Sequence, residues 1–344
     1  MKQAKKDAIK IDKARQKYHI VKKSTNICPS GSRIEQGPGL DDKKNVALAS
    51  LIETERNSKE IRAAKKRVLV MAAVPRDKRH VLALWSQLEC FTIGVDHVII
   101  AVPRWSKEIT MQIIELAKDR IPRFRGGEVT IQPEYFLNDR YDVGLWCDAI
   151  DSLNIDDFDE FGLINDSVFA LRSFSEVFDA LSLKNVSLAS TGYSYTPKFF
   201  EGDDDPVNFW VESIYRGFTK AGIDIFREHS CVPKNHPFFC PEKDDNKACI
   251  VNNFEHDLAI QYPCDKVYGI YPSDAPSNFL ERSRHRMWAR NTPYWSALKT
   301  DLNFPIAKVK QTSRFQKAAS KVKKCANYFD DVVENIDLSL AKSR

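Results

Sequence analysis

Apolar and polar positions divide the chain between residues 67 and 182 into short segments of two kinds. Continuous apolar runs, as at 68–74, are typical of strands that are buried on both faces. Between these runs lie stretches whose apolar residues recur every three or four positions, which is the spacing of an amphipathic helix. The pattern predicts strands at 68–74, 95–102, 128–132 and 161–164, and helices at 80–91, 106–120 and 142–153.

This alternation predicts an α/β fold. Strands and helices follow one another at intervals of roughly 25–35 residues, which is typical of a mainly parallel, Rossmann-like sheet flanked by helices. The first strand leads into Val74-Pro75-Arg76-Asp77 and lacks the G-x-G-x-x-G turn of dinucleotide-binding enzymes. The sequence also lacks a P-loop lysine and a G-x-S-x-G elbow, which argues against NTPases and α/β-hydrolases.

The pattern changes on both sides of this α/β part. After residue 185 the alternation becomes less regular, and we expect extended chain at 193–200 and helices at 209–221 and 253–262. We therefore divide the chain into a basic N-terminal extension that is partly helical or flexible, the α/β part, an irregular continuation of the same domain, and a basic helical tail, at residues 1–66, 67–192, 193–305 and 306–344.

Charge is distributed unevenly along the chain. Residues 1–66 hold 17 Lys and Arg against 8 Asp and Glu, whereas the remainder holds 35 against 39. The basic arm suits a peripheral contact with anionic lipid, although a solvated helical extension is the simpler interpretation. The mildly acidic body has no recognition helix and no basic-aromatic platform, so we expect no nucleic-acid partner.

Eight cysteines leave three interpretations open. Four of them fall between residues 231 and 264, and the run His229-x-Cys231-x₄-His236-x₃-Cys240 contains residue types that zinc binds. The run lacks the paired C-x₂-C spacing of strong zinc motifs. Buried free thiols are the leading interpretation, a disulfide comes second, and zinc comes third.

The most informative polar cluster is Asn165-Asp166-Ser167, directly after the predicted strand at 161–164. The carboxyl ends of parallel strands are where α/β sheets bind ligands, and a cluster of oxygen-bearing side chains there suits a hard cation that bridges to phosphate. The alternative is a turn that caps a following helix, since apolar residues at spacings of three and four come next in the chain.

Two separate motifs resemble the rhamnan synthesis F family of glycosyltransferases. RYDVGLW at 140–146 corresponds to a Gly-Tyr-Asp-aromatic-Gly segment of that family, with an arginine in place of the first glycine. FDE at 158–160, followed by LINDSVF at 163–169, corresponds to a Tyr-Asp-Glu strand that ends in Asn-Asp-Ser-Val-Phe/Tyr. Both motifs occur in the family's order and spacing.

The resemblance implies a GT-A-like fold, a nucleotide-diphosphate sugar as donor, a glycan acceptor, and Mn²⁺ or Mg²⁺ as cofactor. It implies that Asp166 is the metal ligand, with Asn165 and Ser167 as orienting or water-mediated contacts. Asp142 would bind the nucleotide or sugar hydroxyls, and Arg140 would approach phosphate. Alternatively, Arg140 and Asp142 are a structural pair where the helix begins.

An inverting transferase also needs a carboxylate that accepts the proton of the acceptor hydroxyl. Glu255 and Asp257 are the candidates for this role, and Asp224 and His229 are weaker ones. The expected activity is transfer of a deoxyhexose such as rhamnose. The alternatives are the same fold with a UDP- or GDP-hexose donor, and a non-catalytic relative that binds glycan or scaffolds a synthase.

The compartment follows less directly from the sequence. No apolar run approaches the ~20 residues that span a bilayer, and the basic start has no apolar core behind it, so we expect a soluble chain without a signal peptide. A cytoplasmic or peripheral membrane location is expected, with the Golgi lumen as the alternative. Asn165-Asp166-Ser167 and Asn185-Val186-Ser187 are formal N-glycosylation sequons, the first of them inside the expected site.

Overall fold

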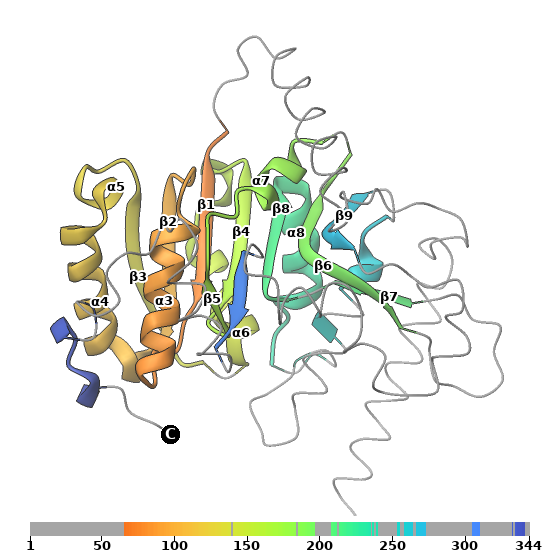
Figure 1. The fold of residues 1–344 in the computed structure, drawn as a ribbon. Helices are drawn as coiled ribbons and strands as arrows, with labels where there is room; N and C mark the ends of the chain where they lie inside the picture. Colours follow the sequence, from red (N-terminus) through yellow and green to blue (C-terminus); the bar gives the residue numbers. More distant parts are fainter. Residues whose placement is uncertain are drawn as a thin grey trace, which may run out of the picture.

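The computed structural model contains one main sheet with helices on both of its faces (Figure 1). It describes residues 65–138, 140–183, 185–196, 208–211, 213–234, 236, 239, 253–254, 258–263, 266–272, 305–309, 332 and 334–340. The strands are β1 (Arg67–Ala72), β2 (His97–Pro103), β3 (Thr130–Phe136), β4 (Glu160–Asn165), β5 (Val168–Ala170), β6 (Leu188–Thr196), β7 (Asn208–Val211), β8 (Tyr215–Thr219), β9 (Val267–Pro272) and β10 (Ile306–Lys308).

The helices alternate with these strands as the sequence pattern predicts. The α-helices are α3 (Lys78–Cys90), α4 (Lys107–Arg120), α5 (Pro122–Arg125), α6 (Tyr141–Ser152), α7 (Glu176–Leu181) and α8 (Lys220–Ser230). Short 3₁₀ turns are η1 (Arg104–Ser106), η2 (Ile155–Asp157), η4 (Ala259–Gln261) and η7 (Leu338–Leu340). The strands and helices that were predicted between residues 68 and 164 are thus confirmed, with small shifts of their ends.

The main sheet has the strand order β3-β2-β1-β4-β8-β6-β7, and β9 pairs with β6. The four strands β3, β2, β1 and β4 are parallel to one another. β8 is antiparallel to both β4 and β6, and β9 is parallel to β6. The expected α/β class, a mainly parallel sheet with flanking helices, is confirmed.

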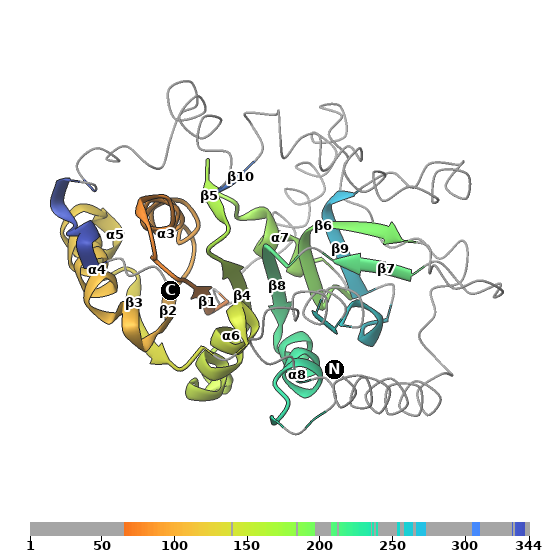
Figure 2. The same cartoon turned by 90° about the horizontal axis from the view of Figure 1, so that it is seen from below.

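Two apolar cores lie on opposite faces of the sheet. Side chains of α3, α4 and α7 pack on one face, and side chains of α6 and α8 pack on the other. Figure 2 shows the same separation, with α3 and α6 on opposite sides of β1. Because both faces are covered, the inner strands consist almost entirely of buried apolar residues, which explains their continuous apolar runs.

The helix predicted at 209–221 is wrong. This stretch forms β7 and β8, and α8 begins only at Lys220. The backbone of β8 is hydrogen-bonded to strands on both sides, so the ladder satisfies the groups that a helix would have paired internally. Gly162 and Gly217 lie opposite each other in β4 and β8, and a Cβ on Gly217 would lie 2.6 Å from the side chain of Val177 in α7. The glycine therefore serves the close packing of α7 on the sheet.

The end segments of the chain are described only in part. Residues 1–64 lie outside the described residues, as does most of the expected irregular region after 231. Residues 306–308, expected in a helical tail, are strand β10, which pairs antiparallel with β5. β6 crosses the proposed boundary at residue 192. Within the described part of the chain, no helix has the length and apolarity that crossing a membrane requires.

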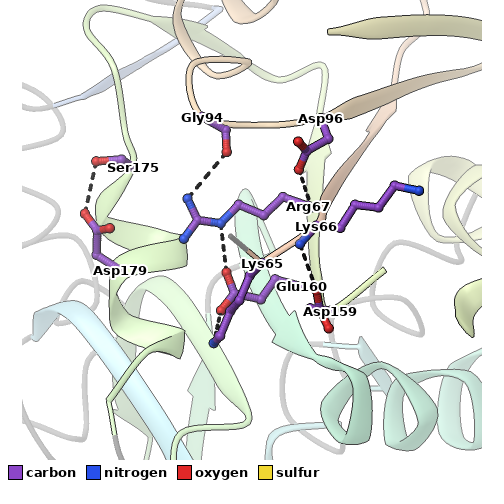
Figure 3. Close-up of polar contacts among 9 residues, drawn as sticks. All are labelled: Lys65, Lys66, Arg67, Gly94, Asp96, Asp159, Glu160, Ser175 and Asp179. Atoms are coloured by element: carbon purple, nitrogen blue, oxygen red, sulfur yellow. Dashed lines mark hydrogen bonds and ion pairs between the residues drawn. The ribbon is translucent and has the colours of Figure 1, made fainter. Parts of the chain in front are cut away.

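A buried carboxylate joins β1 to β4 at the edge where both strands begin. The side chain of Glu160 is fully buried, and both Lys65 and Arg67 form ion pairs with it, the latter at 2.9 Å (Figure 3). The Arg67 backbone amide also donates to Asp96 at 2.7 Å. Since a buried charge is costly without partners, these contacts hold β1 in one register against β4.

We expect the loss of Arg67 to destabilise the protein strongly. Arg67→Met leaves the buried Glu160 with Lys65 alone, and should lower the free energy of unfolding by roughly 3 kcal/mol. The matched control is Lys118→Met, which breaks an exposed pair with Glu115 and should cost under about 0.5 kcal/mol. Urea unfolding measures both variants, and equal midpoints would contradict the role given to Glu160.

Candidate functional site

The site lies at the edge of the sheet where β1 and β4 end. The two strands pair in register up to Ala72 and Asn165. The next residues therefore leave the sheet side by side, and the backbone amide of Val74 donates to the Asp166 carboxylate at 3.1 Å. This hydrogen bond holds the Asp166 side chain at the carboxyl edge, where α/β sheets bind ligands.

The Asn165-Asp166-Ser167 segment forms a tight turn. The Asn165 side-chain oxygen accepts from the Ser167 backbone amide at 3.1 Å and from its hydroxyl at 2.6 Å. From α3, the Gln87 amide donates to the backbone carbonyls of Asn165 and Val168, both at 2.9 Å. The expected helix does not follow at once, because β5 comes first and pairs with β10. The turn therefore joins two strands and does not cap a helix.

Asp142 is brought to the same edge by α6. The helix begins at Tyr141, whose φ of 54° is unusual for a residue with a side chain and marks strain at this point. The Asp142 carboxylate forms a hydrogen bond with the Asn165 side chain. The two separate sequence motifs thus meet in space, which brings Asp142 and Asp166 into one cluster.

The negative charge of Asp142 disfavours ionisation of Asp166. Burial raises the pKa of Asp166 to about 7; the charge of Arg76 opposes this shift, and the charge of Asp142 adds to it. Burial also raises the pKa of Asp142, while backbone amides, Asn165 and Arg216 act in the opposite direction. Close, desolvated carboxylates of this kind are typical of functional sites, and a bound cation would favour their ionised forms.

Arg216 supports this cluster from inside the sheet. It lies in β8 opposite Leu163 of β4, and its side chain is fully buried. Its positive charge lowers the pKa of Asp142. No pattern along the chain points to this residue, because the apolar spacing of the segment predicts a helix and the pairing of β8 with β4 is not visible in the sequence.

A second group missed by sequence reasoning follows β1. Asp77 caps α3 by accepting from the His80 backbone amide at 3.0 Å, and its carboxylate also contacts His80 Nδ1 at 2.8 Å. His80 Nε2 contacts the guanidinium of Arg76 at 2.7 Å. Because a guanidinium only donates, Nε2 accepts and Nδ1 carries the proton, so His80 is neutral. Burial lowers the pKa of His80, in agreement with this tautomer.

This group holds Arg76 beside Asp166, whose pKa the Arg76 charge lowers. In the sequence, the segment VPRD at 74–77 shows only that a glycine-rich turn is absent after the first strand. Its position after a buried parallel strand was the signal that could have identified it. The site therefore contains a guanidinium, held by His80, close to the Asp166 carboxylate.

Arg140 has structural contacts. Its side chain is buried, and one guanidinium nitrogen donates to the backbone carbonyls of Ser230 at 3.1 Å and Val232 at 3.5 Å. The guanidinium also lies over the ring of Phe239, 4.7 Å from its centre. These contacts tie the start of α6 to the end of α8, and an approach of Arg140 to phosphate stays a prediction.

The remaining candidates divide into two groups. Glu255 and Asp257 lie outside the described residues, so their role stays a prediction. Asp224 lies near the start of α8 and forms an ion pair with Arg227 at 3.9 Å. His229, near the end of that helix, contacts the backbone carbonyl of Asn253 at 3.0 Å.

Cys231 is neither a free thiol nor a zinc ligand. It forms a disulfide with Cys147 of α6, with a Cα–Cα distance of 5.2 Å. The interpretation of these two cysteines as free thiols is therefore wrong, because folding brings two distant segments together. Among the described residues, no group of three or more His, Cys, Asp or Glu side chains is placed to hold a metal ion.

The residues of the site fit a hard cation that also binds the substrate. Asp142 and Asp166 offer carboxylate oxygens, and Ser167 offers a hydroxyl. Mg²⁺ typically takes one or two protein carboxylates and completes its shell with water and phosphate oxygens. A site with two carboxylates fits this kind of binding better than a cage made of protein ligands alone.

Comparisons with known proteins give a fold likeness only. No protein-family model and no curated protein matches the sequence. Similar solved structures include 4-diphosphocytidyl-2C-methyl-D-erythritol synthase from Anaerococcus prevotii, at 14% identity over 60% of this chain and 87% of that one, with a TM-score of 0.36. The galactosyltransferase LgtC matches at 11% identity over 77% of this chain and 99% of its own, with a TM-score of 0.38.

The glycosyltransferase GlyE from Streptococcus pneumoniae matches at 8% identity, over 80% of this chain and 62% of its own, with a TM-score of 0.34. At these levels the likeness concerns the arrangement of strands and helices. The functional argument therefore rests on the residues of this chain.

We predict that Asp166 makes stability depend on pH. Its pKa in the folded chain, about 7, lies above the ordinary value of 3.8. The stabilisation is therefore present in full below pH 3.8 and is lost as the pH rises through about 7. Without divalent cations, the wild type should lose up to roughly 4 kcal/mol across this interval relative to Asp166→Asn. Urea unfolding at several pH values measures the difference, and parallel profiles would contradict the shift.

Proposed function

We propose that the protein is a metal-assisted glycosyltransferase of GT-A type, which moves a sugar from a nucleotide-diphosphate donor to a glycan acceptor. The observation that carries the proposal is the meeting of Asp142 and Asp166 at the carboxyl edge of the sheet. Each belongs to one of the two motifs that resemble the rhamnan synthesis F family. Contact between motifs that are separate in sequence supports a common task for them.

The chemistry requires positive charge at the leaving group. As the glycosidic bond of the donor breaks, the diphosphate gains negative charge, and Mn²⁺ or Mg²⁺ would neutralise that charge when bound. Asp166 would hold the metal through its carboxylate, which the Val74 amide orients. The Asn165 side chain fixes the Ser167 hydroxyl beside it, so both residues orient the turn.

Arg76 supplies a fixed charge from the chain itself. The Asp77–His80 contact holds His80 in the tautomer that accepts from Arg76, which keeps the guanidinium at the edge of the sheet near Asp166. A guanidinium suits phosphate oxygens, because its donors match their geometry. We propose that Arg76 binds the diphosphate of the donor and that Asp142 contacts the nucleotide or sugar hydroxyls.

The acceptor side rests on the chemistry of transfer and on the family resemblance. Glu255 and Asp257 are proposed to accept the proton of the attacking hydroxyl, which increases the nucleophilicity of the oxygen. A deoxyhexose such as rhamnose is the proposed sugar. The sugar follows from the family resemblance, whereas the two carboxylates are proposed because an inverting transferase needs a base on the acceptor side.

We predict that nucleotide diphosphates stabilise the protein only together with a divalent cation. With Mn²⁺ present, at least one of UDP, dTDP and GDP should raise the melting temperature, because a ligand that binds the folded state stabilises it. The nucleotide that gives the largest shift identifies the donor class. If no nucleotide with metal changes the melting temperature, the catalytic proposal fails and a non-catalytic glycan-binding protein becomes the better explanation.

We predict that Asp166→Ala abolishes sugar transfer without unfolding the protein. Loss of the metal ligand should lower kcat by roughly 10²–10³-fold or more, because charge on the leaving group is no longer neutralised. The control is Asp119→Ala, which removes an exposed carboxylate on α4. Circular dichroism checks the fold of both variants. Activity in Asp166→Ala equal to that of the control would refute the metal assignment.

We predict that Arg76→Met raises the KM for the donor roughly tenfold or more, because a charged hydrogen bond to phosphate is lost. The control is Arg79→Met, which removes a neighbouring exposed arginine that pairs with Asp77. Steady-state kinetics with the donor varied separates KM from kcat. Equal KM values for the two variants would contradict phosphate binding by Arg76.

A further inference from the structure

A disulfide links α6 to the residue that follows α8. Cys147 and Cys231 are 84 residues apart in sequence and form one covalent link. Cys90, on the opposite face of the sheet, is disulfide-bonded as well. Structural disulfides persist in oxidising compartments and are rare in the cytosol. The cysteines therefore point to a lumenal or extracellular location and away from the cytoplasmic one expected from the sequence.

The second observation is the exposed sequon Asn185-Val186-Ser187. Asn185 is exposed and has a φ of 72°, in the left-handed region that Asn tolerates better than most residues. Val186 and Ser187 are buried, and the Ser187 backbone amide donates to the backbone carbonyl of Lys266 at 2.8 Å. The Asn185 side chain thus lies on the surface of a turn whose following residues are anchored.

Asn185 lies at the end of the sheet where β4 and β6 begin, which is opposite the end that carries the site. It precedes β6, whose first residue Leu188 pairs with Phe218, and Phe218 pairs with Phe161 at the start of β4. Asp166 follows the other end of β4. A large group on Asn185 would therefore leave the carboxyl edge open to substrates.

The other sequon does not offer such a site. Asn165 is buried, and its side chain bonds Ser167, Asp142 and the backbone carbonyl of Ser213. A glycan on this amide would displace those contacts in the folded protein. The two sequons are thus distinguished by the fold and not by their sequences.

We propose that the chain matures in an oxidising secretory compartment, where Asn185 receives an N-linked glycan and Cys147 pairs with Cys231. The proposal is independent of the glycosyltransferase activity.

Both modifications have defined chemistry. In the first, the Asn185 side-chain nitrogen forms a bond to C1 of an oligosaccharide carried on a lipid diphosphate; the C1–oxygen bond breaks, the lipid diphosphate leaves, and the amide loses one proton. In the second, the two thiols lose two protons and two electrons to the disulfide of an oxidised thiol–disulfide oxidoreductase, which becomes a dithiol.

The protein isolated from its natural source tests the proposal. Free thiols are first blocked with iodoacetamide, and the protein is then digested without reduction and analysed by mass spectrometry. We expect a peptide pair linked through Cys147 and Cys231. We also expect that peptide N-glycosidase releases a peptide in which Asn185 has become aspartate, with the mass of aspartate in place of asparagine. Alkylated Cys147 and Cys231, or an unmodified Asn185 peptide, would overturn the proposal.

Variants of the full chain, secreted from a eukaryotic host behind a secretion signal, test the site. Ser187→Thr should keep the glycosidase-sensitive shift on a denaturing gel, whereas Ser187→Ala and Asn185→Gln should each abolish it. Both losses should leave nucleotide binding with Mn²⁺ unchanged, since Asn185 lies away from the site. A shift that persists in Asn185→Gln would place the glycan elsewhere and contradict the assignment.

Discussion

The parallel register between β1 and β4 is the constraint on which the site depends. At one end, the buried Glu160 carboxylate forms ion pairs with the side chains of Lys65 and Arg67 at the start of β1. At the other end, the same register places the Val74 amide within hydrogen-bonding distance of Asp166. A shift by one residue would turn the apolar side chains of β1 to the opposite face and would separate Glu160 from Arg67. One pairing therefore determines both the stability of the sheet centre and the position of the site carboxylate.

The buried carboxylates of Asp142 and Asp166 lower the stability of the folded state, and neighbouring positive charges offset part of this loss. Burial raises the pKa values of Asp142 and Asp166, and the charge of Asp142 raises that of Asp166 further, so the folded state would be more stable with neutral side chains at these positions. Arg216 and Arg76 reduce this cost from two sides, one inside the sheet and one at its edge. Arrangements that reduce stability in this way are typical of functional sites, because the same charges are available to a ligand.

The two ends of the parallel strands β1 and β4 carry different features. The edge where β1 and β4 begin carries the Glu160 ion pairs and the exposed Asn185, neither of which approaches the site. At the other edge, the strained start of α6 is held by the Arg140 contacts and, further along the helix, by the disulfide to Cys231. Covalent and polar contacts thus concentrate around the helix that presents Asp142, whose position is not determined by sheet pairing.

The sequence by itself determined the α/β class, the positions of the early strands and helices, and the identity of Asp142 and Asp166 as related residues. These features are local: apolar periodicity follows from burial on one or two faces, and each motif is continuous along the chain. The strand β8, the fixed Arg76, the buried Arg216 and the disulfide were decided only by tertiary structure. Each depends on contacts between residues far apart in the chain, and the free energy of those contacts overrides local propensity, as it does where the expected helix at 209–221 becomes two strands.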